Sequence, residues 1–198
     1  MRTAAFIGLG SNLEEPLSQL RRAAMALGAI PDSCLQAVSP AYRSDPVGGP
    51  PGQPDFVNAV ALLDTGLEAH ALLDALQDIE HAQQRVRDVR WGPRTLDLDL
   101  LVFGEQMIAD ARLNVPHPRM HQRAFVLYPL ADIAPGLCIP GHGLVRDLLR
   151  TCPYAGLDRL EAGIISEQQG TRVGQVEAWV QGFLDRREVS AAVAVRHS

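Results

Sequence analysis

The stretch RWGPRTLDLDLL, at residues 90–101, decides the fold, because its second half is the clearest strand in the chain. Side chains alternate between the two faces of a strand, so the leucines at 96, 98 and 100 share one face while Asp97 and Asp99 share the other. The two carboxylates repel each other and need a compensating partner. Residues 96–103 are therefore predicted to form a strand with a leucine face and a face that carries a charged site.

The elements around this strand follow from apolar periodicity. Before it we expect a strand at residues 4–9, a helix at 16–28, an extended stretch at 34–43, a strand at 57–65 and a helix from 68 to about 85. After it we expect an extended piece near 107–113, helical turns at 121–133 and a helix near 144–150. The order β-α-β-β-α-β is typical of an α+β, ferredoxin-like fold, in which an antiparallel sheet carries its helices on one face.

Two segments interrupt this pattern. Eight of the fifteen residues from Pro40 to Pro54 are Pro or Gly, which predicts a long surface loop without regular structure. The composition changes near residue 161, so we expect one domain at 1–160 and an extension at 161–198. The extension is predicted to form one amphipathic helix and a flexible tail. We expect a monomer, with self-association through one face of this helix as the alternative: Val176, Trp179, Val180 and Phe183.

The composition excludes several classes of function. The 198 residues carry a net charge of −5, which disfavours binding to long nucleic acid, and no nucleic-acid partner is expected. All 18 basic residues are Arg, so the chain has no P-loop lysine, no Schiff-base lysine and no kinase strand lysine. Any phosphate chemistry must therefore rely on Arg, main-chain N–H groups or a metal ion.

The cysteines and the apolar runs bear on the location of the protein. Cys34, Cys138 and Cys152 are far apart and form no C-x-x-C pair, which favours reduced thiols over disulfides or a zinc site. The N-terminus has no long apolar run of the kind that signal peptides contain, and 18 apolar residues never follow one another. We expect a cytoplasmic protein without a membrane partner.

Asp97 and Asp99 have the character of a metal site. Mg²⁺ prefers oxygen ligands and is usually held by one or two carboxylates together with substrate phosphates. The alternative for a D-x-D pattern is a solvated polar face on an edge strand. Four arginines, at 85, 87, 90 and 94, precede the pair, and guanidinium groups near a carboxylate–metal centre suit a triphosphate. This cluster favours a metal–phosphate site, although salt bridges at a helix end remain equally open for Arg85 and Arg87 taken singly.

Two other motifs point to no ligand of their own. Residues 8–13, GLGSNL, begin like a dinucleotide-binding loop but end in Leu13, so we expect a tight turn. His117 and His121 are spaced i, i+4, but Pro118 lies between them and the sequence offers no third ligand. A phosphate contact by His117 is therefore favoured over structural zinc.

Four motifs in order resemble the 6-hydroxymethyl-7,8-dihydropterin pyrophosphokinase family of folate biosynthesis. They are GLGSNL at 8–13, QPDFVN at 53–58, RWGPRTLDLD at 90–99, and VPHP at 115–118 followed by RAF at 123–125. The resemblance extends over about residues 4–155 and implies a ferredoxin-like fold. It also implies a reaction in which the β,γ-pyrophosphoryl group of ATP moves to the pterin hydroxymethyl oxygen and AMP is released.

The resemblance implies roles for individual residues. Asp97 and Asp99 would bind two Mg²⁺ ions, and Arg85 and Arg94 would stabilise charge during transfer. The residues expected to bind the nucleotide are Gln77, Glu80, Arg85, Arg94, Arg112 and His117. The residues expected to bind the pterin are Ser44, Pro46, Val47, Phe56, Asn58, Trp91, Arg123 and Phe125. Phe56 and Phe125 would enclose the pterin ring between them.

The chain departs from the family pattern in the loop before the aspartates. Gln84 stands where the family usually has Gly, and residues 87–91 are one residue short, which affects how this loop would close. A second hypothesis is a non-catalytic module that binds single-stranded RNA through its aromatic and arginine residues. Such modules stack bases on paired aromatics but lack a carboxylate pair on the strand, so Asp97 and Asp99 discriminate between the two hypotheses.

Overall fold

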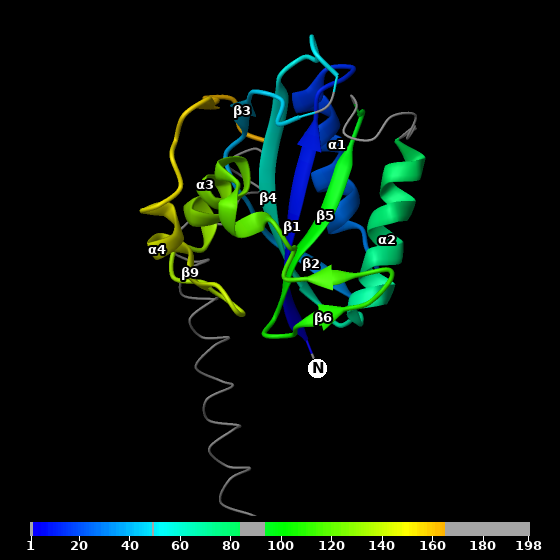
Figure 1. Ribbon diagram of the computed structural model, residues 1–198. Coiled ribbons are helices and arrows are strands. Elements are labelled where there is room, and N and C mark those ends of the chain that lie inside the picture. The colour runs from blue at the N-terminus through cyan, green and yellow to red at the C-terminus, as the bar shows by residue number, and fades with distance from the viewer. Residues whose placement is uncertain (1, 49, 84–93, 165–198) are drawn as a thin grey trace, which may run out of the picture.

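The computed structural model describes residues 2–48, 50–83 and 94–164. An α+β fold forms around one six-stranded antiparallel sheet, and the described residues include four α-helices (Figure 1). Arg85, Trp91 and the expected C-terminal helix with Val176, Trp179, Val180 and Phe183 lie outside these residues. Among the described helices, none combines the length and the apolar character that a membrane crossing requires.

The strands of the sheet lie in the order β10-β3-β4-β1-β5, with β2 paired to another part of β4. The central strands are β1 (Thr3–Ser11) and β4 (Phe56–Thr65), and β5 (Asp97–Phe103) flanks β1. The other members are β2 (Ser33–Val38), β3 (Tyr42–Ser44) and β10 (Leu157–Arg159). Each neighbouring pair is antiparallel, as the sequence predicts.

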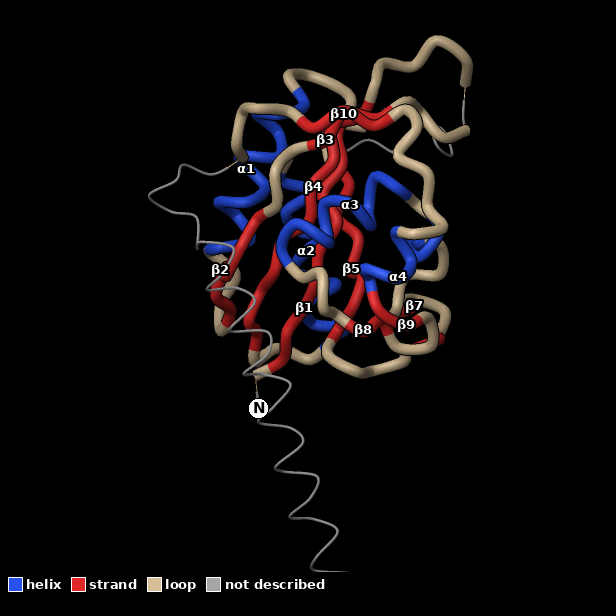
Figure 2. The backbone as a smooth tube through the Cα atoms, turned by 90° about the vertical axis from the view of Figure 1, so that its left-hand side faces the viewer, coloured by secondary structure: helices blue, strands red, loops and turns tan. Residues whose placement is uncertain are grey.

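The two helices of the expected β-α-β-β-α-β pattern share one face of the sheet, and two further helices cover the other face. On one face lie α1 (Pro16–Gly28) and α2 (Ala69–Ala82). On the other lie α3 (Ala124–Ile133) and α4 (Val145–Leu149), which face the viewer in Figure 2. The segment between β5 and α3 contains two short strands that pair with each other, β6 (Ile108–Ala109) and β7 (Asn114–Val115). It also contains a 3-10 turn, η1 (Met120–Gln122). A further pair, β8 (Cys138–Ile139) and β9 (Gly143–Leu144), precedes α4.

Alternation along β1 divides the core in two. Ala5, Ile7 and Leu9 pack with α1 and α2, whereas Ala4 and Phe6 pack with α3 and α4. The next two positions of β1 on the α3 face are Gly8 and Gly10. The side chain of Leu101 covers Gly8, whereas among the residues that the structure describes only Asn58 and Asp97 come within 4 Å of the point where a side chain at Gly10 would begin. This end of the α3 face is therefore shaped to receive groups other than core side chains.

A β-bulge changes the expected alternation of β5. Ile7 pairs with Leu100 and Phe6 pairs with Val102, so Leu101 has no register partner on β1. Leu98 and Leu100 pack on the α1 and α2 side, but the next two residues, Leu101 and Val102, both pack on the α3 side. The period of two thus holds through both aspartates and ends at the bulge. Bulges of this kind redirect the chain and are frequent next to active sites.

The expected Pro- and Gly-rich loop needs one correction, and residues 163 and 164 contact the core. The Pro- and Gly-rich segment is not without regular structure, because Tyr42–Ser44 form β3 between β4 and β10. Ser39 and Pro40 lie in the break between β2 and β3. At the other end, Ile164 is 5% exposed within the first core, and Arg21 of α1 donates to the carbonyl oxygen of Gly163 at 3.0 Å. The packed domain therefore continues past residue 160.

Candidate active site

The two aspartates of β5 lie on the α3 face, opposite the leucines that pack on α1 and α2. In the sheet register, Gly10 pairs with Asp97 and Gly8 pairs with Asp99. Both aspartates are partly exposed, and Arg94 forms an ion pair with Asp97. The carboxylates therefore project over a strip of β1 that carries no side chains.

Cationic groups surround this pair. Arg123, which precedes α3, is half-buried, and its pKa is lowered by burial and by Arg119, while Asp99 and Asp97 raise it. These effects show that Arg123 lies within electrostatic reach of both carboxylates and of Arg119. The sequence reasoning missed Arg119, although it stands only two residues after His117. A loop arginine in that motif is the signal that could have found it.

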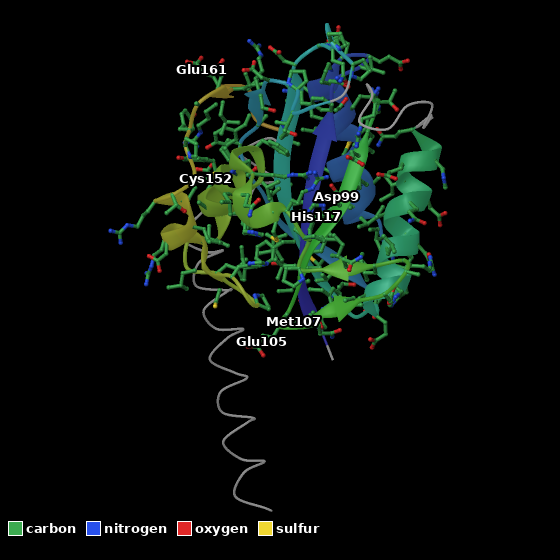
Figure 3. All side chains as sticks on the ribbon, in the orientation of Figure 1. Asp99, Glu105, Met107, His117, Cys152 and Glu161 are labelled. Atoms are coloured by element: carbon green, nitrogen blue, oxygen red, sulfur yellow. The ribbon has the colours of Figure 1, made fainter. Side chains whose placement is uncertain are left out.

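The backbone N–H of His117 donates to the carbonyl oxygen of Leu101, the bulge residue of β5, at 2.8 Å. This bond holds His117 against the strand that carries both aspartates, and Figure 3 shows His117 close to Asp99. Burial lowers the pKa of His117 to about 4, with further lowering by Arg123 and Arg119. Its Nδ1 accepts the backbone N–H of Arg119 at 3.3 Å. The ring is therefore neutral at pH 7, and the tautomer assigned from this bond carries its proton on Nε2 as a donor.

Asn12 joins two loops at the edge of the site. Its side chain is 2% exposed, its Oδ1 accepts the backbone N–H of Arg94 at 2.8 Å, and its Nδ2 donates to the carbonyl oxygen of Pro54 at 3.1 Å. Its backbone N–H donates to the Arg94 carbonyl oxygen at 3.1 Å. The sequence indicated only a tight turn here. Asn12 thus connects the segment before Phe56 with the segment before Asp97.

The other half of the α3 face carries the residues expected to bind the pterin. Asn58 pairs with Gly10 in the register, and its Nδ2 donates to Ser44 Oγ at 2.9 Å. A methyl group at Gly10 would lie 3.4 Å from Asn58 Oδ1 and 3.9 Å from Asp97 Cβ. Gly10 therefore lies between the amide of Asn58 and the carboxylate of Asp97 and places no side chain between them.

Two aromatic side chains flank this half of the site. Phe56 is two residues before Asn58 on β4, so both side chains leave the same face of the sheet. Phe125 lies in the first turn of α3 and is partly buried, with the Arg123 guanidinium carbon 5.5 Å from its ring centroid. Pro46 is half-buried, and Val47 is 73% exposed on the loop after β3. β4 and α3 thus supply one aromatic ring each.

Two residues expected at the nucleotide have other partners. Glu80 of α2 is 3% exposed, and its Oε1 accepts the backbone N–H of Leu98 at 2.7 Å. Arg112 forms an exposed ion pair with Asp74 of α2. Gln77 is half-buried on the same helix. The structure therefore groups Arg94, Asp97, Asp99, His117 and Arg123, but it directs Glu80 to the strand and Arg112 to α2.

The donor set fits a magnesium ion. Asp97 and Asp99 offer carboxylate oxygens, and in the described part of the chain no third His, Cys, Asp or Glu joins them into a larger group. Mg²⁺ is commonly held by one or two carboxylates with water and phosphate as its remaining ligands. The arginines and the Nε2–H donor of His117 suit the phosphate oxygens. These features are those of a class of site that could hold a metal ion together with a polyphosphate.

Comparison with known proteins identifies the family within this class. The family model for 7,8-dihydro-6-hydroxymethylpterin-pyrophosphokinase (HPPK) matches residues 6–135. The chain belongs to this family, and the resemblance inferred from the four motifs is confirmed.

Two bacterial relatives show how far the similarity extends. The 2-amino-4-hydroxy-6-hydroxymethyldihydropteridine pyrophosphokinase of Pseudomonas aeruginosa is 57% identical over 155 residues, which are 78% of this chain and 95% of the relative. The Haemophilus influenzae protein of the same name is 47% identical over 146 residues, or 74% of this chain and 91% of the relative. Each match spans nearly the full length of the relative, and the family model covers all four motifs.

A solved structure resembles the fold. An HPPK-DHPS variant from Plasmodium falciparum, crystallised with pterin and p-hydroxybenzoate, superimposes with a TM-score of 0.63 at 12% sequence identity. The match covers 80% of this chain and 47% of that chain, so this protein spans about half the length of the Plasmodium protein. At this identity the likeness concerns the fold alone.

Proposed function

We propose that this protein transfers the β,γ-pyrophosphoryl group of ATP to the hydroxymethyl oxygen of 6-hydroxymethyl-7,8-dihydropterin and releases AMP, in the biosynthesis of folate. The observation that carries the proposal is the carboxylate pair of β5, which lies beside Arg94, Arg123 and a neutral His117. Relatives that share the whole site region are named for this reaction. ATP is the co-substrate, and the partners of the enzyme are these two small molecules.

We further propose that Asp97 and Asp99 hold two Mg²⁺ ions. When bound, the ions neutralise the phosphate oxygens and polarise the phosphorus that is attacked. Arg94, Arg119 and Arg123 spread the remaining negative charge over fixed donors, and His117 donates through Nε2 without adding a charge. Arg85 and Trp91 complete this half of the site in the proposal.

The nucleotide is proposed to extend from the aspartates toward α2. Gln77 lies on that helix, and Arg112 reaches it through Asp74. The Arg112–Asp74 pair is more than half exposed on both sides, so a phosphate or ribose group can replace Asp74 at little cost. Glu80 contributes by holding β5 in place.

The pterin is proposed to lie between Phe56 and Phe125, with its edge at Asn58. Because Ser44 accepts one proton of the Asn58 amide, the orientation of that amide is set before the pterin arrives. Ser44, Pro46 and Val47 line the adjacent edge. The hydroxymethyl group then points across Gly10 toward Asp97, where no side chain obstructs it.

Phosphorus NMR tests the reaction directly. Incubation with ATP, Mg²⁺ and the pterin alcohol should yield AMP and a pterin diphosphate. Formation of ADP instead would show an ordinary kinase, and no turnover would contradict the proposal. The RNA-binding alternative is tested by filter binding, since tight binding of single-stranded RNA without Mg²⁺ would favour that alternative.

The proposal also includes the type of fold and the location of the protein. The chain order of the strands around β1 and β4, with α1 and α2 on one face, supports a ferredoxin-like core to which α3 and α4 are added. Cys34 and Cys138 are exposed free thiols, and exposed thiols persist in a reducing compartment, which supports a cytoplasmic location.

A further inference from the structure

A buried tyrosine connects the sheet to α3 next to the proposed pterin position. Tyr42 of β3 is 4% exposed, and its hydroxyl donates to Asp132 Oδ2 at 2.6 Å. Tyr42 pairs with Asn58 in the β3–β4 register and with Arg159 in the β10–β3 register. Arg159 Nη1 lies 3.7 Å from Asp132 Oδ1. One carboxylate in the last turn of α3 is thus held by two neighbouring strands.

The same helix carries Phe125 at its other end. Phe125 and Asp132 are seven residues apart, which places them about 20° apart around the helix axis and about 10 Å apart along it. Neither belongs to the apolar stripe of the helix, which consists of Val126, Leu127, Leu130 and Ile133, although Phe125 is partly buried against the same core. A stripe of this kind sets the depth of a helix on a sheet, but it resists rotation about the helix axis only weakly. A hydrogen bond beside the stripe opposes that rotation directly.

The spacing between the two aromatic rings is demanding. Two rings that enclose a third must lie about 7 Å apart, because carbon atoms pack best at about 3.5 Å. β4 carries Phe56 and α3 carries Phe125, so the angle of α3 determines this spacing. Rotation of α3 would move Phe125 toward or away from Phe56.

We propose that Tyr42 and Asp132 are positioning residues that set the spacing between Phe56 and Phe125 and thereby determine the affinity for the pterin. The inference rests on the proposed function, because the pterin position comes from it. Burial, followed by the hydrogen bond to Asp132, raises the pKa of Tyr42, so the hydroxyl remains a donor throughout the working pH range.

Pterin affinity, measured by calorimetry with Mg²⁺ and a non-hydrolysable ATP analogue, tests this inference. Tyr42→Phe and Asp132→Ala should each weaken pterin binding about five- to tenfold, the equivalent of one hydrogen bond. Affinity for the ATP analogue should change less than twofold. Asp132→Asn keeps an acceptor for the Tyr42 hydroxyl and should restore most of the pterin affinity. In the Asp132→Ala background, Tyr42→Phe should cause no further loss.

The chain offers a matched control. The Tyr128 hydroxyl, also on α3, donates to the carbonyl oxygen of Cys152 at 3.1 Å, and Tyr128→Phe should leave pterin affinity unchanged. Equal weakening by Tyr42→Phe and Tyr128→Phe would overturn the inference, as would unchanged affinity in Tyr42→Phe and Asp132→Ala. Failure of the wild-type protein to bind pterin would overturn the proposed function, and this inference with it.

Discussion

Asp97 and Asp99 are one residue apart but have different surroundings. Asp97 forms an ion pair with Arg94 at 21% exposure on both sides, and it lies beside the empty position of Gly10. Asp99 lies beside Gly8, farther along the strand toward the bulge. The ion pair lowers the repulsion between the carboxylates before any metal arrives. Both residues should contribute to activity, and the pair with Arg94 should contribute to the stability of the free protein.

Asp97→Asn and Asp99→Asn should each reduce AMP formation about a thousandfold, because metal stabilisation is worth several kcal/mol and each 1.36 kcal/mol is tenfold in rate. Without metal, Asp97→Asn should lower the free energy of unfolding by about 0.5–1 kcal/mol, since it loses the pair with Arg94. Urea unfolding and NMR assays measure both quantities. A large loss of stability in Asp99→Asn would indicate a structural carboxylate.

His117 makes stability depend on pH. Its pKa is lowered to about 4 in the folded protein, below the ordinary value of 6.5. Between these values the unfolded chain binds a proton that the folded chain does not, so the free energy of unfolding should fall as the pH drops from 6.5 to 4. In His117→Asn this part of the pH dependence should disappear. Urea unfolding at pH 7 and pH 4.5, without metal or nucleotide, measures the difference.

The exposed His81 of α2 provides a control for this experiment. His81→Asn should keep the pH dependence of the wild-type protein. Burial and His121 also lower the pKa of His142, but that contribution is the same in wild type and variant, so it cancels. An unaltered slope in His117→Asn would contradict the assignment of a buried, neutral imidazole.

At the scale of elements, α2 fixes the strand that carries the aspartates. β5 is an edge strand with β1 on one side, and Glu80 supplies an acceptor for the Leu98 N–H on the other side. Leu98 stands between Asp97 and Asp99, so this bond holds the segment that must present both carboxylates.

Glu80→Ala should lower the free energy of unfolding by about 1–3 kcal/mol, because the Leu98 N–H loses its acceptor. It should also raise the Mg²⁺ concentration needed for half-maximal activity. Glu80→Gln keeps an oxygen acceptor and should restore most of both properties. Asp78→Ala, on the exposed side of α2, should change neither. A magnesium titration that is the same for Glu80→Ala and wild type would show that the bond does not hold the aspartates.

The sequence predicts the long elements, because α1, α2, β4 and β5 have strong periodicity of their own. It could not predict β3 and β10, which are three residues each and depend on pairing with distant strands. Nor could it predict the bulge at Leu101, which local sequence does not encode. The roles of Asn12 and Glu80 likewise come from hydrogen bonds to residues far along the chain. Motifs therefore locate the site, and tertiary contacts determine which side chains face it.

In the molecule as a whole, one face of the sheet is filled by core packing and the other face carries the candidate site. The face with α1 and α2 is closed by side chains along the length of β1, whereas the α3 face ends at Gly8 and Gly10. The protein carries a net charge of −5, yet Arg94 and Arg123 lie beside the aspartates, and Arg119 lies near Arg123. A positive region within an acidic protein attracts a polyphosphate locally and leaves the rest of the surface repulsive to it.

Truncation distinguishes the packed domain from the remaining chain. Removal of residues 165–198 should leave the free energy of unfolding unchanged, because Ile164 and the Gly163 carbonyl oxygen remain in place. Removal of residues 162–198 should lower it by about 2–4 kcal/mol, the range expected when a buried Ile is lost. Size-exclusion chromatography of the full chain tests the proposal of a monomer. A larger species that disappears on truncation would support self-association through the face of Val176 and Trp179.

Activity should respond differently from stability. The described residues that we place in the site lie between Asn12 and Phe125, so both truncated proteins should form AMP at nearly the wild-type rate at a temperature where they remain folded. The comparison is informative because the shorter protein loses core packing on the α1 and α2 side, opposite the site. A shorter protein that stays folded but loses activity would show that packing beneath β1 controls the aspartates across the sheet. A protein ending at Ile164 that keeps its stability but loses activity would instead show that residues 165–198 take part in the reaction.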